Sequence, residues 1–140
     1  MTPTKNNNDQ PRAKLLLIED DTFLAGMYVT KLTLESYQAE LATDGKSGLE
    51  KAKKLKPDLI LLDILLPKMN GFDVLRALKK DAATKNIPVI LLTNLGQKDD
   101  VVKGLELGAA DYLIKAHFMP SEVIAKIAEV LKQQGKHGRD

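Results

Sequence analysis

An acidic residue interrupts an otherwise apolar segment of this chain. The stretch DLILLDILLP (58–67) places Asp63 among leucines and isoleucines, a composition typical of a strand that is buried on both faces. An ionised carboxylate inside a protein is costly unless a cation or hydrogen bonds compensate it. We therefore expect Asp63 either to lie at the end of a strand or to be required for chemistry.

Other chemically active side chains end or follow similar apolar runs. They are Glu19, Asp20 and Asp21 at the end of the first run, Thr93 at the end of IPVILLT (87–93) and Lys115 at the end of DYLIK (111–115). Carboxylates that lie close together raise one another's pKa values unless a cation intervenes. Mg²⁺ takes one or two carboxylates and keeps waters for a phosphate, so it suits this set better than Ca²⁺. The set predicts a Mg²⁺ site at which the Asp63 carboxylate accepts a phosphoryl group as an acyl phosphate.

The segments that must position these residues alternate between two periodicities. Short apolar runs predict five strands, at 13–19, 38–42, 58–63, 87–93 and 111–115, of which 38–42 is the most polar. Helical spacing of apolar residues predicts five helices between and after them, at 22–35, 45–55, 71–82, 98–107 and 120–134.

Strict alternation of strand and helix predicts an α/β fold, because right-handed crossovers build a parallel sheet with helices on both faces. The polar run 38–42 is typical of an edge strand, while the apolar runs suit central strands. In such open sheets the ligand site lies beyond the carboxyl ends of the strands, where the strand order reverses. We therefore expect the acids, Thr93 and Lys115 to meet at that edge.

Composition narrows the classes of function. The 140 residues, 44% of them hydrophobic, suit one domain, and 21 basic against 19 acidic residues leave a charge of +2 without a basic block. A nucleic-acid partner is therefore not expected. The chain has no cysteine, no signal peptide and no apolar run long enough to span a membrane, which favours a cytoplasmic protein. Residues 1–12 and 135–140 are expected to be disordered tails.

Four motifs in order carry a resemblance to a known family. They are LLLIEDD (15–21), DILLPKMNG (63–71), PVILLTN (88–94) and LGAADYLIK (107–115). With these motifs, residues 13–134 resemble the receiver domain of bacterial two-component response regulators. The resemblance implies an open five-stranded parallel sheet of order 2-1-3-4-5, with helices on both faces.

The resemblance also implies roles for individual residues. Asp63 would be the phospho-acceptor, Glu19 and Asp20 the acidic pair, and Mg²⁺ would be held by Asp20, Asp63 and the backbone carbonyl of Leu65. Thr93 and Lys115 would contact the phosphoryl oxygens and, with Asp63, carry the catalytic work, while Tyr112 would change rotamer with them.

The resemblance further implies partners. A histidine kinase or histidine phosphotransfer protein would donate the phosphoryl group. A downstream protein would then bind a surface formed by the fourth helix, fifth strand and fifth helix. Such a protein is not an enzyme acting on other molecules: it catalyses only its own phosphorylation and slow dephosphorylation.

Two residues depart from the family pattern, and two other functions stay open. Ala116 stands where the family usually has proline after the lysine, which favours a trans peptide and a different loop, and Asn94 stands where a small residue is usual.

A degenerate receiver that binds partners constitutively is one alternative. An aspartyl-phosphate hydrolase is another, disfavoured because Leu65 stands where such enzymes need a second acid. Only GKHGRD follows the last helix, so we expect a stand-alone receiver, either a monomer or a dimer formed on phosphorylation.

Overall fold

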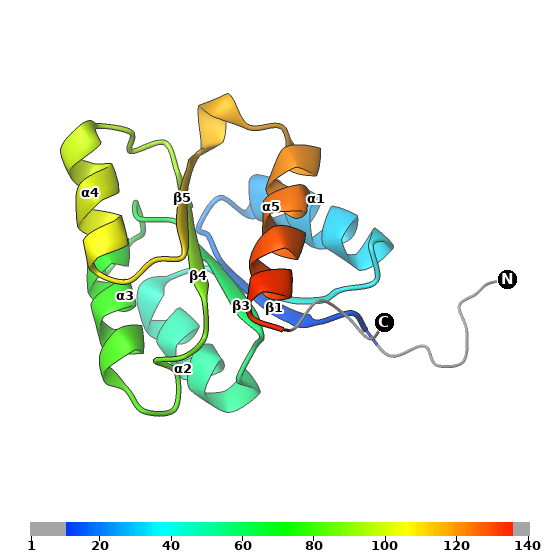
Figure 1. Cartoon of the computed structure of the whole chain (residues 1–140), viewed down its shortest axis with the longest axis horizontal. Helices are drawn as coiled ribbons and strands as arrows, with labels where there is room; N and C mark the ends of the chain where they lie inside the picture. The colour runs from blue at the N-terminus through cyan, green and yellow to red at the C-terminus, as the bar shows by residue number, and fades with distance from the viewer. Residues whose placement is uncertain (1–10, 136–140) are drawn as a thin grey trace, which may run out of the picture.

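The computed structural model describes residues 11–135, and in this range strands and helices alternate as expected (Figure 1). The strands are β1 (Lys14–Ile18), β2 (Gln38–Ala42), β3 (Leu59–Leu62), β4 (Val89–Thr93) and β5 (Asp111–Ile114). The α-helices are α1 (Thr22–Leu34), α2 (Gly45–Leu55), α3 (Gly71–Lys80), α4 (Lys98–Glu106) and α5 (Pro120–Gln133), and a 3₁₀ turn, η1, covers Lys115–His117. Most of both expected tails, residues 1–10 and 136–140, lies outside the described range.

The five strands form one parallel sheet of order β2-β1-β3-β4-β5, which confirms the expected topology. The register pairs Ile18 of β1 with Leu62 of β3, so the two strands end side by side. The polar strand β2 lies at an edge, as its composition predicts, and the apolar strands β1, β3 and β4 occupy the centre. Because β1 and β3 are neighbours, the residues that follow them start from adjacent points of the sheet.

Helices cover both faces of this sheet and bury two separate cores. Helices α1 and α5 lie on one face, and α2, α3 and α4 lie on the other (Figure 1). Successive strand residues point to opposite faces, so Leu15 and Leu17 join the α1/α5 core while Leu16 and Ile18 join the other. The central strands therefore have no polar face, which explains their continuous apolar runs.

Short polar side chains fix the starts of three helices. Asp21, Asp44 and Asn70 precede α1, α2 and α3, and each side chain accepts a hydrogen bond from a backbone N–H of the first turn. Pro120 opens α5, where its missing N–H costs nothing. Within residues 11–135, no helix has both the length and the apolarity needed to cross a bilayer.

The structure differs from the expected boundaries mainly after β5. Lys115 begins the turn η1 instead of ending the strand, and none of the described peptide bonds is cis. A proline at position 116 would disfavour helical backbone angles at Lys115. Because Ala116 imposes no such restriction, the chain can turn immediately at Lys115, and this turn sets the approach of the lysine to the sheet edge.

Candidate functional site

The carboxyl ends of β1 and β3 bring three acidic residues together. Glu19 and Asp20 follow β1, and Asp63 follows β3. One carboxylate oxygen from each of the three residues lies within 4.8 Å of the others. The expected convergence of the acids is therefore found, and it results from the pairing of two strands whose sequences are about 40 residues apart.

Lys115, which directly follows the edge strand β5, joins this acidic cluster. Its Nζ lies 2.7 Å from Glu19 Oε1 and 2.8 Å from Asp63 Oδ2. The two carboxylates are buried, with side chains 3% and 5% exposed, so their negative charges are compensated mainly by one shared ammonium. This ion pair accounts for the acid inside the apolar stretch DLILLDILLP.

Backbone groups hold the remaining carboxylate oxygens. The N–H of Asp21 donates to Glu19 Oε2 at 3.0 Å, and the N–H of Leu65 donates to Asp63 Oδ1 at 3.2 Å. The loop after Asp63 is fixed by Gly71, whose N–H donates to the Ile64 carbonyl at 2.8 Å. A Cβ at position 71 would lie 2.4 Å from the Asp63 carbonyl oxygen, so only glycine fits against this loop.

Opposing effects set the ionisation of the buried groups. Burial raises the pKa of Glu19. The hydrogen bonds from Lys115 and from the N–H of Asp21 lower this pKa, whereas the negative charge of Asp63 raises it further. Burial also disfavours the charged form of Lys115, but its hydrogen bonds to Asp63 and Glu19 outweigh burial and raise its pKa. The ammonium is thus held charged at neutral pH between the two acids.

The donor set of the cluster suits a hard divalent cation. Asp20 is exposed, and within residues 11–135 its carboxylate makes no hydrogen bond or ion pair. The carbonyl of Leu65, a residue that is also exposed, accepts no hydrogen bond from the described residues. Oxygen ligands of this kind, few in number and open to water, are those that Mg²⁺ uses. The residues present therefore fit the metal expected from the sequence.

Thr93 and Tyr112 are joined through one loop residue. Thr93 ends β4, next to β3, and is fully buried; its Oγ1 accepts a hydrogen bond from the Leu95 N–H at 3.3 Å. The hydroxyl of Tyr112 donates to the carbonyl of the same residue, Leu95. Burial, with smaller effects of the charges of Asp100 and Asp63, raises the pKa of Tyr112 to about 12, so it remains a neutral donor.

The sequence did not indicate that Leu95 and Gly104 take part in this arrangement. A Cβ at Gly104 of α4 would lie 2.6 Å from Leu91 and 2.9 Å from the ring of Tyr112. The available signal was the glycine itself, because a glycine inside a helical pattern can have a packing reason. The backbone contact of Leu95 has no sequence signal, because any residue supplies an N–H and a carbonyl. Asn94 and Ala116, the two departures from the family pattern, are both exposed.

Comparisons with known proteins agree with this geometry. Residues 15–128 match the model of the response regulator receiver domain. The chain belongs to this family. It is 39% identical over 120 residues to the DNA-binding dual master transcriptional regulator RpaA of Synechocystis sp., covering 86% of this chain and 49% of RpaA. It is also 39% identical to the DNA-binding response regulator MtrA of Mycobacterium tuberculosis, covering 89% of this chain and 53% of MtrA.

Solved structures of receivers share the fold. A CheY-like response regulator receiver domain protein from Methanospirillum hungatei is 30% identical, with a TM-score of 0.82 over 89% of this chain and 98% of that one. The chemotaxis protein CheY4 of Vibrio cholerae is also 30% identical, with a TM-score of 0.79 over 85% and 98%. The chain is thus a receiver domain of two-component systems, and it spans about half the length of the curated relatives it matches.

Proposed function

We propose that this receiver accepts a phosphoryl group on Asp63 from a phosphohistidine of a histidine kinase or phosphotransfer protein. The observation that carries the proposal is the Asp63 carboxylate, held by Lys115 beside the exposed carboxylate of Asp20. A carboxylate oxygen of Asp63 attacks phosphorus in line, the bond from phosphorus to the imidazole nitrogen breaks, and the imidazole departs. The product is an acyl phosphate on this chain and a free histidine on the donor.

Neighbouring residues have distinct parts in this step. Lys115 presents an ammonium to the transferring oxygens, and the N–H of Leu65 orients the nucleophilic carboxylate. Asp20, Asp63 and the Leu65 carbonyl would hold Mg²⁺, and Glu19 would complete the acidic pair beside them. When bound, Mg²⁺ would neutralise the negative charge that builds up as a phosphoryl group approaches a carboxylate.

The output of the receiver is proposed to be a changed surface. Thr93 ends β4, which pairs with β3, and a phosphoryl group on Asp63 would offer its hydroxyl a charged acceptor. A shift of Thr93 would disturb the Leu95 backbone and with it the hydroxyl of Tyr112. The surface formed by α4, β5 and α5 would then favour a second arrangement and bind a downstream protein.

Two other functions have less support. A receiver that only binds partners constitutively would not need Lys115 and Asp20 in this geometry. A hydrolase acting on other phosphorylated molecules would need a second acid two residues after the nucleophile, and Leu65 occupies that place. We therefore propose that the chain is not an enzyme in that sense, and that it acts in the cytoplasm, where histidine kinases are supplied with ATP.

Incubation with acetyl phosphate and Mg²⁺ tests the proposal directly. Intact mass should rise by one phosphoryl group in the parent and in the control Asp99→Asn, which changes an exposed acid of α4. Asp63→Asn should show no increase, because the nucleophile is gone. Asp20→Asn should be phosphorylated slowly and bind Mg²⁺ weakly. An equal mass increase in Asp63→Asn would contradict the assignment of the acceptor.

The relatives RpaA and MtrA are described as DNA-binding, whereas a nucleic-acid partner is not expected from the charge of this chain. That expectation stays a prediction. Titration of the purified chain with duplex DNA at increasing salt measures it, because non-specific binding weakens steeply with salt.

A further inference from the structure

Tyr28 of α1 carries a buried hydroxyl that has no hydrogen-bond partner in the described part of the chain. The residue is only 5% exposed. A buried hydroxyl without a partner costs free energy, and native proteins rarely contain one without a reason. Phenylalanine would fill the same space without this cost. The hydroxyl of Tyr28 is therefore expected to find a partner in some other state of the protein.

The direction of α1 brings this hydroxyl toward the acidic cluster. Side chains of a helix lean toward its amino end and cover the preceding turn. Helix α1 begins directly after Asp21, at the edge of the sheet that carries the cluster, so the ring of Tyr28 is directed toward that edge. The residue three positions earlier on the same buried face is Ala25, whose small side chain leaves room for the ring.

The charges that act on Tyr28 identify its neighbours. Burial raises the pKa of Tyr28, the ammonium of Lys115 lowers it, and the carboxylate of Glu19 raises it. Both charges belong to the ion pair in which Lys115 Nζ lies 2.7 Å from Glu19 Oε1. The hydroxyl thus lies within electrostatic range of both members of this pair, on the face of the sheet that α1 and α5 cover.

Phosphoryl transfer to Asp63 would change the partners of Lys115. An ammonium has three N–H donors, and Lys115 directs its donors to Glu19 and Asp63. A phosphoryl group on Asp63 would offer the ammonium new charged acceptors and draw it away from Glu19. Of its present donors, the buried Glu19 carboxylate would then keep the N–H of Asp21. A buried carboxylate with so little compensation is unfavourable.

We propose that Tyr28 is a positioning residue for phosphoryl transfer, whose hydroxyl donates to the Glu19 carboxylate when Lys115 turns to the phosphoryl group. The tyrosine would hold the acid in place after its first partner has left. This inference rests on the proposed function, because phosphorylation is the event that moves Lys115. Tyr28 acts through Glu19 and Lys115, and no covalent bond changes at the tyrosine itself.

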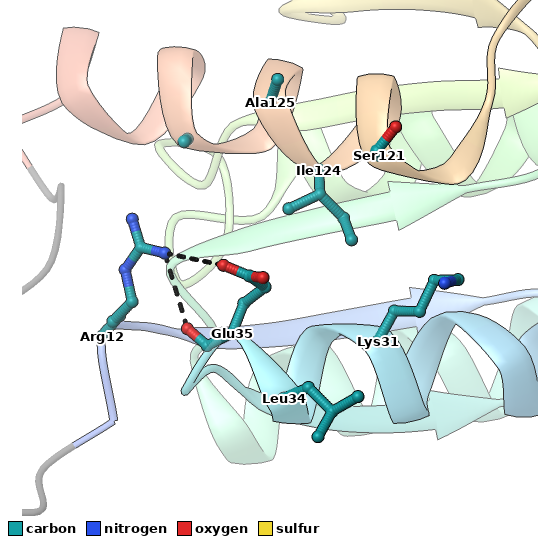
Figure 2. Close-up of a pocket in the computed structure, with 8 residues that line it drawn as sticks. Arg12, Lys31, Leu34, Glu35, Ser121, Ile124 and Ala125 are labelled. Atoms are coloured by element: carbon teal, nitrogen blue, oxygen red, sulfur yellow. Dashed lines mark hydrogen bonds and ion pairs between the residues drawn. The ribbon is translucent and has the colours of Figure 1, made fainter. Parts of the chain in front are cut away.

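Tyr28→Phe removes the hydroxyl and keeps the ring, and Tyr37→Phe is the matched control. Tyr37 is 4% exposed, and its hydroxyl also lacks a hydrogen bond to the residues that the structure describes. It lies before β2, at the amino end of the sheet, where the guanidinium of Arg12 covers its ring. Figure 2 shows the same guanidinium paired with Glu35 beside a groove between α1 and α5. Both variants lose a buried hydroxyl, but the control loses one far from the acidic cluster.

The rate of phosphorylation is the first measurement. With acetyl phosphate and Mg²⁺, Tyr28→Phe should react about tenfold more slowly than the parent, because the transition state already engages Lys115, and Tyr37→Phe should keep the parent's rate. A tenfold change is equivalent to about 1.4 kcal/mol, near the lower end of what a hydrogen bond to a charged group contributes. Mg²⁺ binding before phosphorylation should be unchanged, since Lys115 still holds Glu19. Equal rates in the parent and Tyr28→Phe would overturn the proposal.

A spectroscopic signal separates this role from a general structural effect. The NMR chemical shift of a tyrosine Cζ atom responds to the hydrogen bond of the hydroxyl that it carries. The chain has three tyrosines, Tyr28, Tyr37 and Tyr112, so labelled protein gives three such signals, which the phenylalanine variants assign. On phosphorylation the Tyr28 signal should move and the Tyr37 signal should stay. A Tyr28 signal that does not move in phosphorylated protein would contradict the proposal.

A second variant tests the same hydroxyl without phosphorylation. Lys115→Met also takes the ammonium away from Glu19, so Tyr28 should become the donor to this acid, and its Cζ signal should move. Tyr28→Phe should hardly change the urea midpoint of the parent but should lower that of Lys115→Met, whereas Tyr37→Phe should act equally in both backgrounds.

Equal effects of Tyr28→Phe in the two backgrounds, with an unmoved Tyr28 signal in Lys115→Met, would overturn the inference. A parent protein that takes up no phosphoryl group would instead refute the proposed function. In that case the coupling between Tyr28 and Lys115 would still decide whether the hydroxyl is the second donor to Glu19.

Discussion

Replacing Lys115 by methionine tests the electrostatic centre of the site. The Lys115 ammonium lies 2.7 Å from Glu19 Oε1 and 2.8 Å from Asp63 Oδ2. Methionine keeps much of the apolar side chain and removes only the charge. Each buried carboxylate then keeps one hydrogen bond, from the N–H of Asp21 or of Leu65. The variant therefore leaves two buried acids side by side without their shared cation.

The expected loss of stability follows from this geometry. Removing one partner of a buried ion pair costs about 3–5 kcal/mol. Here the cost has an upper limit, because one of the two acids takes up a proton once keeping both ionised becomes more expensive than protonation. We expect Lys115→Met to lose about 2–4 kcal/mol of unfolding free energy at neutral pH. Because Lys115 is largely buried, solvent screening reduces this figure little.

The loss should depend on pH in a defined direction. Burial already raises the pKa of Glu19, and removing Lys115 raises it further. A carboxyl whose pKa is higher in the folded state binds more protons when folded, so the free energy of unfolding falls as pH rises between the unfolded and folded pKa values. The deficit relative to the parent should thus be small below the unfolded pKa of about 4.3 and grow toward neutral pH.

Equilibrium urea unfolding in EDTA and in Mg²⁺ provides the measurement. Mg²⁺ would supply positive charge to the oxygens that lost Lys115, and a ligand present at a hundred times its Kd adds about 2.7 kcal/mol. Lys46→Met, which removes an exposed lysine of α2, is the control. Stability equal to that control in EDTA, or no response of Lys115→Met to Mg²⁺, would refute this account of the site.

Three further predictions concern the loops around the acceptor and glycines of the helices α3 and α1. Leu65 is exposed and Leu95 half-buried, and neither side chain can hold a water in line with the phosphorus. Leu65→Asn combined with Leu95→Glu should therefore speed loss of the phosphoryl group about tenfold, which is equivalent to about 1.4 kcal/mol. Decay of the phosphoprotein after donor removal measures this, and an unchanged rate would show that the leucines do not protect it. Gly71→Ala should cost about 1–3 kcal/mol, because the added Cβ meets backbone. In Gly26→Ala, where a Cβ meets nothing within 4 Å, urea unfolding should show a gain of about 0.5–1 kcal/mol.

The order of elements and the identity of the acids could be read from the sequence, because both depend on local patterns. Strand and helix periodicities differ, and the continuous apolar runs of β1, β3 and β4 are explained by burial on both faces of the sheet. Asp63 was conspicuous because a charge inside such a run is costly. The resemblance of four motifs supplied the sheet order, which periodicity alone leaves open.

Only the tertiary structure decided how these residues meet. Glu19 and Lys115 are 96 positions apart in the chain, and their 2.7 Å contact depends on the packing of β1, β3, β4 and the turn η1. The link from Thr93 to Tyr112 passes through the backbone of Leu95, whose side chain gives no sign of it. Likewise, Lys31 and Ala125 border one groove because α1 and α5 share a face of the sheet. Local patterns record which face of a segment is buried, whereas contacts between distant segments depend on the packing of the whole chain.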